Sequence, residues 1–236
     1  MPNTPTRFPN GVSTNKRSEP LGMFGMPDPT EWHVWFDDFD NFEADQWVIT
    51  RVGTTPTEVS TSADGGVLLM TMAGTDDSSS SLQWSGDDNA GVNETFKFDL
   101  GKQLFFKSRF RVSDATQSDF VIGLQITDTT PLDVSDGVFF KKDDGDANLD
   151  FHVEKNNTAT DALAIHTVVA NTFLTVAFYY DGVSSVKAYV NNVQVANLAT
   201  TNLVDDEELT ISLHMQNGEA VAKTMSVDFI FVAKER

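Results

Sequence analysis

The sequence predicts an all-β protein, an antiparallel β-sandwich preceded by an extended N-terminal arm. Roughly a dozen or more short apolar runs alternate with polar residues, and turn residues separate them, as in sandwich domains. No stretch shows a convincing helical period of any length. No fixed repeat emerges either, which disfavours a propeller or a solenoid. The 236-residue length suits one large β domain, assigned to residues 31–236.

Composition narrows the possible functions. The formal net charge of −19 makes direct nucleic-acid binding by the body very unfavourable. A hydrophobic content of 40% with 18 Phe supports a sizeable core. The absence of Cys removes disulfides, thiolate metal sites and cysteine nucleophiles. No run reaches the roughly 18 apolar residues of a membrane span and no secretory signal is recognisable, so we expect a soluble chain with no membrane partner.

Residues 1–30 form the predicted arm. They hold six of the eight Pro, which disfavour regular structure and keep the chain extended. Three basic residues against one acidic give +2 over residues 1–27, which leaves −21 for the rest of the chain. A segment of this kind has little to fold around alone, so we expect it to bind a partner. The expected contact residues are Arg7, Phe8, Pro9, Lys16, Arg17, Leu21, Met23 and Phe24.

The first stretch of the body, residues 31–42, alternates aromatic and acidic residues. We interpret it as the entry into the sandwich, because large aromatic side chains mostly supply buried area. The alternatives are a ligand-contacting aromatic platform and an acidic metal loop. The expected core anchors are Trp32, Trp35, Phe36 and Phe39.

The strands of the first half follow in order. Residues 47–52 and 66–72 predict two strands, and the serine-rich stretch 76–81 predicts a polar turn before a strand at 82–84. Further strand runs lie at 94–98, 103–112 and 120–126. Gly123 lies inside the last of these, which indicates a bulge or the close approach of another backbone.

The second half continues the pattern with strands at 138–141, 149–154 and 163–169. Residues 173–197 then predict a three-stranded meander. Asp181-Gly182 marks its first turn, and Asn191-Asn192 suits its second because Asn tolerates positive φ. One face of its first two strands collects Leu174, Val176, Phe178 and Tyr180, then Val186, Ala188 and Val190. Runs at 208–216 and 225–233 complete the set.

Calcium is the one cofactor that the sequence suggests, and we otherwise expect none. The acidic turn after residue 142 places oxygen ligands at alternate positions, at Asp144, Asp146, Asn148 and Asp150. A helical calcium loop would need a glycine at its sixth position and a glutamate at its twelfth, where Lys155 stands instead. The other interpretation is a plain acidic hairpin turn.

The sequence contains few signs of catalysis. His152 and His214 lie in strand patterns and could meet, but strand histidines without a nearby carboxylate or serine partner are more often structural. No Gly-x-Ser-x-Gly turn and no glycine-rich phosphate loop is present. We therefore expect no catalytic residues.

The order of several strands resembles the concanavalin A-like lectin and glucanase superfamily, which includes laminin G-like modules. The similar strands are GVFF, LDFHV, LTVAFYYDG, VKAYVNN and the final SVDFIFVAKE. The resemblance covers about residues 31–236. It implies a jelly roll of two curved sheets, one of them concave, with ligands bound at rim loops or in the concave groove.

The arm is similar to the starts of virion structural proteins from marine tailed phages, particularly short-tailed ones. The similar residues are TRFPNGV at 6–12, LGM at 21–23 and PDP at 27–29. This resemblance implies a protein on the capsid exterior, soluble in the host cytoplasm before assembly. Its partners would be the major capsid protein or other virion proteins, with a possible homo-oligomer.

Three functions remain open. The first is a non-enzymatic virion protein that decorates the capsid and is anchored by its arm. The second is a lectin-like adhesion module that recognises a cell-surface glycan, with Trp84 or Tyr179 as stacking platforms. The third, a glucanase, would need a close carboxylate pair, typically Glu-x-Asp-x-Glu. No such motif is present, and neither Glu43-Ala44-Asp45 nor the acidic run 205–208 supplies it.

Overall fold

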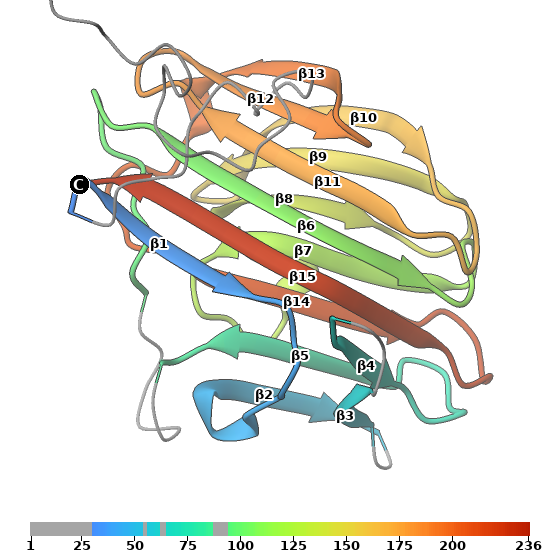
Figure 1. The fold of residues 1–236 in the computed structure, drawn as a ribbon. Helices are drawn as coiled ribbons and strands as arrows, with labels where there is room; N and C mark the ends of the chain where they lie inside the picture. Colours follow the sequence, from blue (N-terminus) through green and yellow to red (C-terminus); the bar gives the residue numbers. More distant parts are fainter. Residues whose placement is uncertain (1–29, 54–55, 62–64, 87–93) are drawn as a thin grey trace, which may run out of the picture.

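The computed structural model describes residues 30–53, 56–61, 65–86 and 94–236. These residues form two antiparallel sheets packed face to face, which confirms the predicted all-β sandwich (Figure 1). The eight contact residues expected in the arm lie outside the described residues, so that prediction stays untested.

The eight-stranded sheet faces the viewer in Figure 1 and is called the front sheet. Its strand order is β13-β12-β11-β6-β15-β4-β3, and β1 pairs with the C-terminal half of β15. The strands are β1 (Trp32–Asp37), β3 (Thr57–Thr61), β4 (Val67–Thr71), β6 (Leu104–Val112), β11 (Leu174–Tyr180), β12 (Ser185–Val190), β13 (Val193–Ala199) and β15 (Thr224–Glu235).

The seven-stranded sheet lies behind and is called the back sheet. Its strand order is β10-β9-β8-β7-β14-β5-β2. The strands are β2 (Trp47–Val52), β5 (Ser79–Trp84), β7 (Ser118–Gln125), β8 (Gly137–Lys142), β9 (Asn148–Lys155), β10 (Thr158–Thr167) and β14 (Thr210–Asn217).

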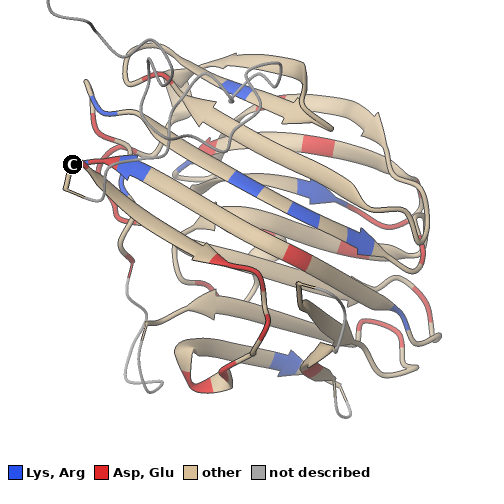
Figure 2. Cartoon of the chain, in the orientation of Figure 1, with Lys and Arg blue, Asp and Glu red and all other residues tan. Residues whose placement is uncertain are grey.

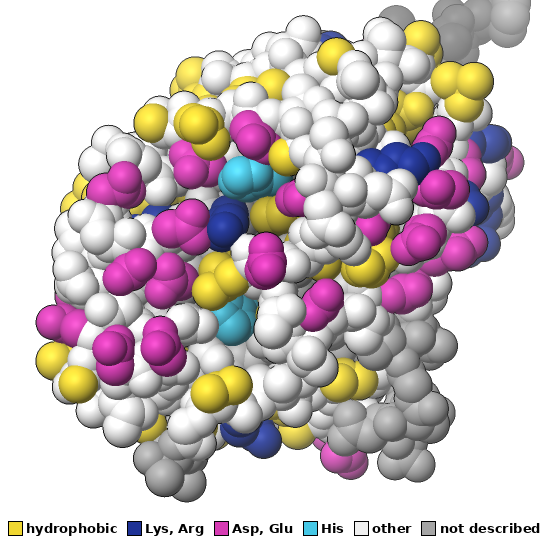
Figure 3. Space-filling view, turned by 180° about the vertical axis from the view of Figure 1, so that it is seen from behind, with side chains coloured by type: hydrophobic (Ala, Val, Ile, Leu, Met, Phe, Trp, Pro, Cys, Tyr) yellow, Lys and Arg dark blue, Asp and Glu magenta, His cyan; other side chains and the backbone are white. Residues whose placement is uncertain are grey.

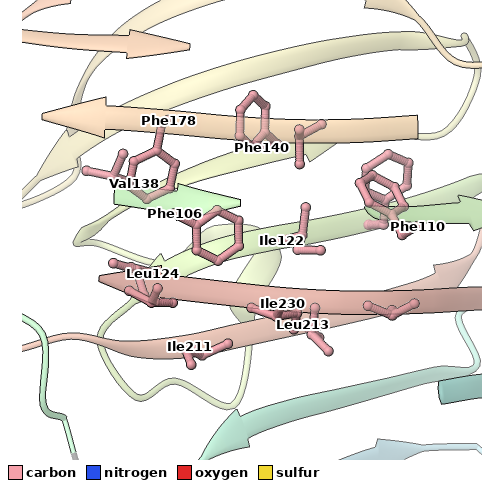
Figure 4. Packing of buried hydrophobic residues seen from close by; sticks show 14 of the residues in the cluster. Phe106, Phe110, Ile122, Leu124, Val138, Phe140, Phe178, Ile211, Leu213 and Ile230 are labelled. Atoms are coloured by element: carbon pink, nitrogen blue, oxygen red, sulfur yellow. The ribbon is translucent and has the colours of Figure 1, made fainter. Parts of the chain in front are cut away.

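The core lies between the sheets because every second residue of each central strand points inward. Phe106 of β6 and Phe178 of β11 stack with ring centroids 5.0 Å apart, and the ring of Phe140 on the back sheet lies 6.4 Å from that of Phe178 (Figure 4). The ring of Phe151, also on the back sheet, lies 5.9 Å from that of Phe178. Each fully buried side chain of this size contributes about 1.5–3 kcal/mol through burial.

The predicted meander is confirmed. β11, β12 and β13 pair in sequence, and all seven residues assigned to its buried face belong to the core. Asn191 and Asn192 have φ angles of 49° and 64°, the left-handed region that a tight two-residue turn requires. The sequence pattern therefore predicted the three strands, their buried face and the Asn191-Asn192 turn.

Gly123 of β7 marks a close approach of two backbones. A Cβ atom at this position would lie 2.5 Å from the carbonyl oxygen of Val138 on β8. Residues 120–125 of β7 pair with β8 without a register shift, so the close approach, and not a bulge, explains the glycine.

Three expectations about the strands were wrong. Ser79, Ser80 and Ser81 belong to β5 and are buried: Ser80 donates a hydrogen bond to Glu58 of β3, and Ser81 lies beside His214 of β14. Residues 94–98 contribute only an isolated bridge, from Phe96 to Leu209. β1 and β3 were not predicted, since each is a short strand at the margin of the front sheet.

Among the described residues, the only helical elements are three 3₁₀ turns, η1 (Ala44–Gln46), η2 (Pro131–Asp133) and η3 (Thr200–Asn202). None of the described helices is long and apolar enough to cross a bilayer.

Candidate functional site

Four phenylalanine rings contact one another on the outer face of the front sheet. The ring centroid of Phe36 on β1 lies 6.4 Å from those of both Phe229 and Phe231 on β15. Phe231 in turn lies 5.6 Å from Phe105 on β6. Phe36 is 57% exposed, although such side chains are usually buried. These four residues are called the aromatic band.

A bulge in β15 explains why the band points outward. The pairing of β15 with β6 shifts by one residue between Val227 and Phe229, so Asp228 is extra. Val227 and Ile230 are thereby both buried, while Phe229 and Phe231 take outward positions. The sequence prediction of Phe36 as a core anchor was wrong, because this side chain points away from the core beside Phe231, its register partner.

Basic side chains lie next to the band. Lys107, Arg109 and Arg111 occupy successive outward positions of β6, where Figure 2 shows basic residues following one another along the strand. Lys187 has the outward position on β12. These four residues are called the basic row. In register, Phe231 lies opposite Lys107 and Phe229 opposite Arg109, so cations and rings alternate across the sheet.

A single ring holds two of these cations in place. The guanidinium of Arg109 lies 4.1 Å from the ring centroid of Phe173, and that of Arg111 lies 4.8 Å from the same centroid. Arg109 also pairs with Asp228, with 2.5 Å between nitrogen and oxygen. Contacts of this cation–π type contribute about 0.5–1 kcal/mol at exposed sites. Both guanidinium groups are therefore positioned on the face and not freely rotating.

The two predicted stacking residues lie in different places. Tyr179 is on the outer face of the front sheet, opposite Phe105 in register, and its ring centroid lies 6.0 Å from the ammonium of Lys187. Trp84 packs edge-on against Trp35 and Trp47, at 4.9 and 5.3 Å, beside the core. The structure therefore groups Tyr179, but not Trp84, with the aromatic band.

The outer face of the back sheet is polar. Figure 3 shows it from behind, with histidine and lysine side chains lying among acidic ones. Its charged and imidazole positions, which alternate with core residues along β7, β8, β9 and β14, are Asp119, Lys141, Asp150, His152, Glu154 and His214. Burial raises the pKa of the Asp119 and Glu154 carboxyl groups, and Asp161 raises that of Glu154 further.

The connection between β7 and β8 covers the middle of this face. Val134 and Leu132 pack on Val121 and Phe139, which are buried outside the main core. The Gln125 side chain donates a hydrogen bond to the carbonyl of Pro131 at 3.0 Å, which ties the connection to β7.

Two histidines of the back sheet, His152 and His214, are held in place by polar partners; His214 is buried and His152 is 15% exposed. His152 Nδ1 lies 2.8 Å from Asp161 Oδ1, and its ring stacks on Phe139. His214 Nδ1 lies 2.7 Å from Ser81 Oγ, and burial lowers the pKa of its imidazole to about 4. The Nε2 atoms of both rings are buried with no hydrogen-bond partner among the described residues.

This arrangement limits what the two histidines can do. A carboxylate that orients an imidazole is typical of general-base catalysis, but a base must reach the proton that it removes. The two histidines also do not meet, because β7 and β8 lie between β9 and β14. Along the strands of the back sheet, no two carboxylates take successive outward positions, as a Glu-x-Asp-x-Glu pattern would require.

The candidate calcium ligands are used in other contacts. Asp146 accepts a hydrogen bond from the Asn148 backbone at 2.7 Å, and Asp150 accepts one from the Ala164 backbone at 2.6 Å. Among the described residues, no group of three or more His, Asp or Glu side chains could hold a metal ion. Calcium binding by Asp144, Asp146, Asn148 and Asp150 stays a prediction.

A buried lysine provides the positive charge beside this acidic turn. Lys142 Nζ donates to the backbone carbonyls of Ser118, Asp143 at 2.9 Å and Thr116 at 3.5 Å. Burial lowers the pKa of this ammonium group, while nearby carboxylates, Asp119 foremost, raise it. These carbonyl oxygens accept hydrogen bonds from the Lys142 ammonium group, so its donors are satisfied without a metal ion at the turn.

The sequence analysis missed the aromatic band. Its signal was present in the run Phe229-Ile230-Phe231-Val232, which is apolar at every position although a sheet with one face in water should alternate. A strand that is apolar on both faces indicates that its outer face has a function other than contact with water. Lys107, Arg109 and Arg111 lie in the predicted strand 103–112, but no role was predicted for them.

Comparisons with known proteins identify the fold and no family. No family model matches the sequence, and no curated protein matches it. Solved structures do match. A non-specific endo-β-1,3(4)-glucanase of family GH16 superposes with a TM-score of 0.63 at 12% identity, over 89% of this chain and 94% of that one.

Two further structures have the same architecture. The carbohydrate recognition domain of Emp47p gives a TM-score of 0.56 at 13% identity, over 88% of this chain and 98% of that one. A protein of unknown function from Shewanella oneidensis MR-1 gives a TM-score of 0.58 at 16% identity, over 87% of each chain. At these identities the likeness concerns the fold alone: the chain is a two-sheet jelly-roll sandwich of the concanavalin A-like type found in lectins and GH16 glucanases.

Proposed function

We propose that the protein is a non-catalytic carbohydrate-binding domain and that its ligand lies on the aromatic band. The observation that carries this proposal is the contact of four phenylalanine rings on the outer face of a sheet, with Phe36 57% exposed. Aromatic rings offer large, rigid apolar surface, on which the C–H face of a sugar ring can pack. Tyr179 would extend the same surface and can add a hydrogen bond from its hydroxyl.

The fold supports a sugar ligand. Solved structures with this architecture include carbohydrate recognition domains, a glucanase and a glucuronan lyase from Trichoderma reesei. Those activities belong to those proteins, and a shared fold does not transfer them. A binding role without chemistry is favoured for this chain because its back-sheet imidazoles have buried Nε2 atoms and its carboxylates do not alternate along one strand.

A glycan array with the full-length protein tests this proposal. Binding to at least one glycan class is expected, and Phe36→Ser should weaken it about tenfold, since a stacked ring contributes about 1–1.5 kcal/mol. The matched control is Leu163→Ser, which removes an exposed apolar side chain from β10 of the back sheet. An array without binding, or equal losses for the two variants, would refute the proposal.

Attachment to a virion is the second candidate. The observation that favours it is the contrast between a Pro-rich segment with a charge of +2 over residues 1–27 and a body of −21. Such a segment could anchor the acidic domain to the capsid and present the aromatic band outward. Deletion of residues 1–30 should abolish binding to purified capsids and leave the circular dichroism spectrum unchanged. Normal capsid binding by the truncated protein would exclude this role.

A further inference from the structure

We propose that the ligand of the aromatic band is an anionic polysaccharide, whose carboxylate or sulfate groups bind the basic row while its sugar rings pack on the phenylalanines. This inference rests on the proposed carbohydrate function and adds the charge class of the ligand. It follows from where the chain places its few basic side chains.

The basic row is unusual in so acidic a chain. Among the described residues, the outward positions of β6, β12 and β15 hold four basic side chains and two carboxylates, those of Asp228 in the bulge and Glu235 near the C-terminus. The whole chain, by contrast, has a net charge of −19. A local positive strip on a negative body attracts anions to that strip and repels them from other parts of the surface.

The row and the band form one surface. Phe229 and Phe231 lie opposite Arg109 and Lys107 across a single pair of strands, and Tyr179 lies opposite Lys187. Outward residues on one strand repeat every ~7 Å, so the row offers successive cations along β6. A polymer with a charged group on its sugars can therefore meet a ring and a cation repeatedly.

The cations remain suited to binding an external anion. Arg109 is 40% exposed in its side chain even though it pairs with Asp228, and a guanidinium has five donors, more than one carboxylate can use. Arg111 is exposed, and no ion pair of its side chain is found among the described residues. Phe173 orients both groups, which lowers the entropy lost when an anion binds.

A polysaccharide fits this surface better than other polyanions. A polysaccharide one sugar wide can bind along the basic row without contacting the acidic surface around it. An acidic protein would place more of its own surface against those acidic residues. Single-stranded nucleic acid also combines anionic groups with rings that stack, so oligo-thymidine is the competing polyanion in the test.

Binding of the full-length protein to four immobilised polymers tests the inference: dextran sulfate, alginate, uncharged dextran and oligo-thymidine. Binding to dextran sulfate or alginate is expected, weakening as salt rises from about 50 to about 300 mM because screening lengths shorten. A sulfate-only or carboxylate-only result identifies the group that is recognised. Preference for oligo-thymidine would overturn the inference.

Matched variants locate the surface. Arg111→Ser with Lys187→Gln should weaken dextran sulfate or alginate binding about tenfold, while Arg111→Lys with Lys187→Arg should retain it. The control, Lys97→Gln with Lys155→Gln, removes the same charge from two lysines that pair with loop residues 205–208, and should change binding less than about twofold. Equal losses in the two charge-removing pairs would overturn the inference.

Other outcomes separate the two proposals. Binding to uncharged glycans alone, sensitive to Phe36→Ser, would refute the anionic ligand and leave the carbohydrate function standing. An absence of binding to every glycan would refute both. Concentration-dependent self-association that Phe36→Ser abolishes, with no glycan bound, would identify the surface as a contact between copies of the chain and would also refute both.

Discussion

The two outer faces of the sandwich differ although the strands beneath them have the same inner pattern. Most inward positions of both sheets are apolar, and these apolar residues form one core. The front sheet presents contacting rings and basic side chains, whereas the back sheet presents carboxylates and histidines beside a connection that covers Val121 and Phe139. Inward residues thus specify the fold, while outward residues, which packing leaves free to vary, distinguish the faces chemically.

The largest effect should be the difference in stability loss between substituting an inward phenylalanine and substituting an outward one. Phe106→Ala removes a fully buried ring that stacks on Phe178, so the free energy of unfolding should fall by about 3–5 kcal/mol. Phe36→Ala should cost less than about 1 kcal/mol, because most of that side chain is already in water. Urea unfolding measures both. Similar losses would mean that the aromatic band is part of the core.

The second effect concerns the acidic turn beside the back sheet. Lys142→Met leaves carbonyl groups without a donor and removes the cation among nearby carboxylates, so stability should fall by about 2–4 kcal/mol. Lys141→Met on the same strand, which loses a partly exposed pair with Asp143, should cost less than about 1 kcal/mol. Thermal melts with and without calcium measure both. If calcium restored the Lys142→Met protein, the turn would be a metal site after all.

The third effect is a pH dependence of protein stability that arises from His214 on the back sheet. In the unfolded state, the pKa of His214 has its ordinary value of 6.5. In the folded state, burial opposes the charge of the imidazolium and lowers this pKa to about 4. The unfolded state therefore binds more protons between these values, and His214 makes stability fall as the pH drops from 6.5 towards 4. His214→Asn should reduce that loss by on the order of 2 kcal/mol.

Its control is His166→Asn, on β10 of the same sheet. Urea unfolding of the wild type and both variants at several pH values between 4 and 7 gives the comparison. A wild-type slope that His214→Asn leaves unchanged would show that other groups control acid stability.

The smallest effect should be the change in protein stability when a residue of the basic row is substituted. Arg111→Ser should change the free energy of unfolding by less than about 1 kcal/mol, since it loses one cation–π contact at an exposed site. A larger loss, seen in the same urea experiments, would mean that the row holds the sheet together and that reduced glycan binding in this variant reflects instability.

Much of the fold could be predicted because alternation and turn chemistry are local. Residues 173–197 specified their own strands and turn, since Asn191-Asn192 tolerates the required φ angles. The predicted strand 82–84 is the end of β5, and the serine half of β5 was missed because the burial of Ser80 depends on Glu58, a residue of another sheet. Phe36 was misplaced because its outward direction depends on pairing with β15, nearly two hundred residues later in the chain.

The candidate site was harder to predict for the same reason. Phe36, Phe105 and Phe231 come from three strands that are distant in sequence, and only the sheet order brings them together. Tyr179 could be selected from the sequence as an outward aromatic residue, whereas Trp84 could not be distinguished from it without knowing which side of β5 faces Trp35 and Trp47.

Lysine acetylation followed by mass spectrometry, with and without dextran sulfate or alginate, tests most directly which face binds. The protein offers Lys187 on the front sheet and Lys141 on the back sheet as internal reporters. If the aromatic band and the basic row bind the polysaccharide, the ligand will slow acetylation of Lys187 and leave Lys141 unchanged. Protection of Lys141 with Lys187 unaffected would place the ligand on the back sheet and contradict the account.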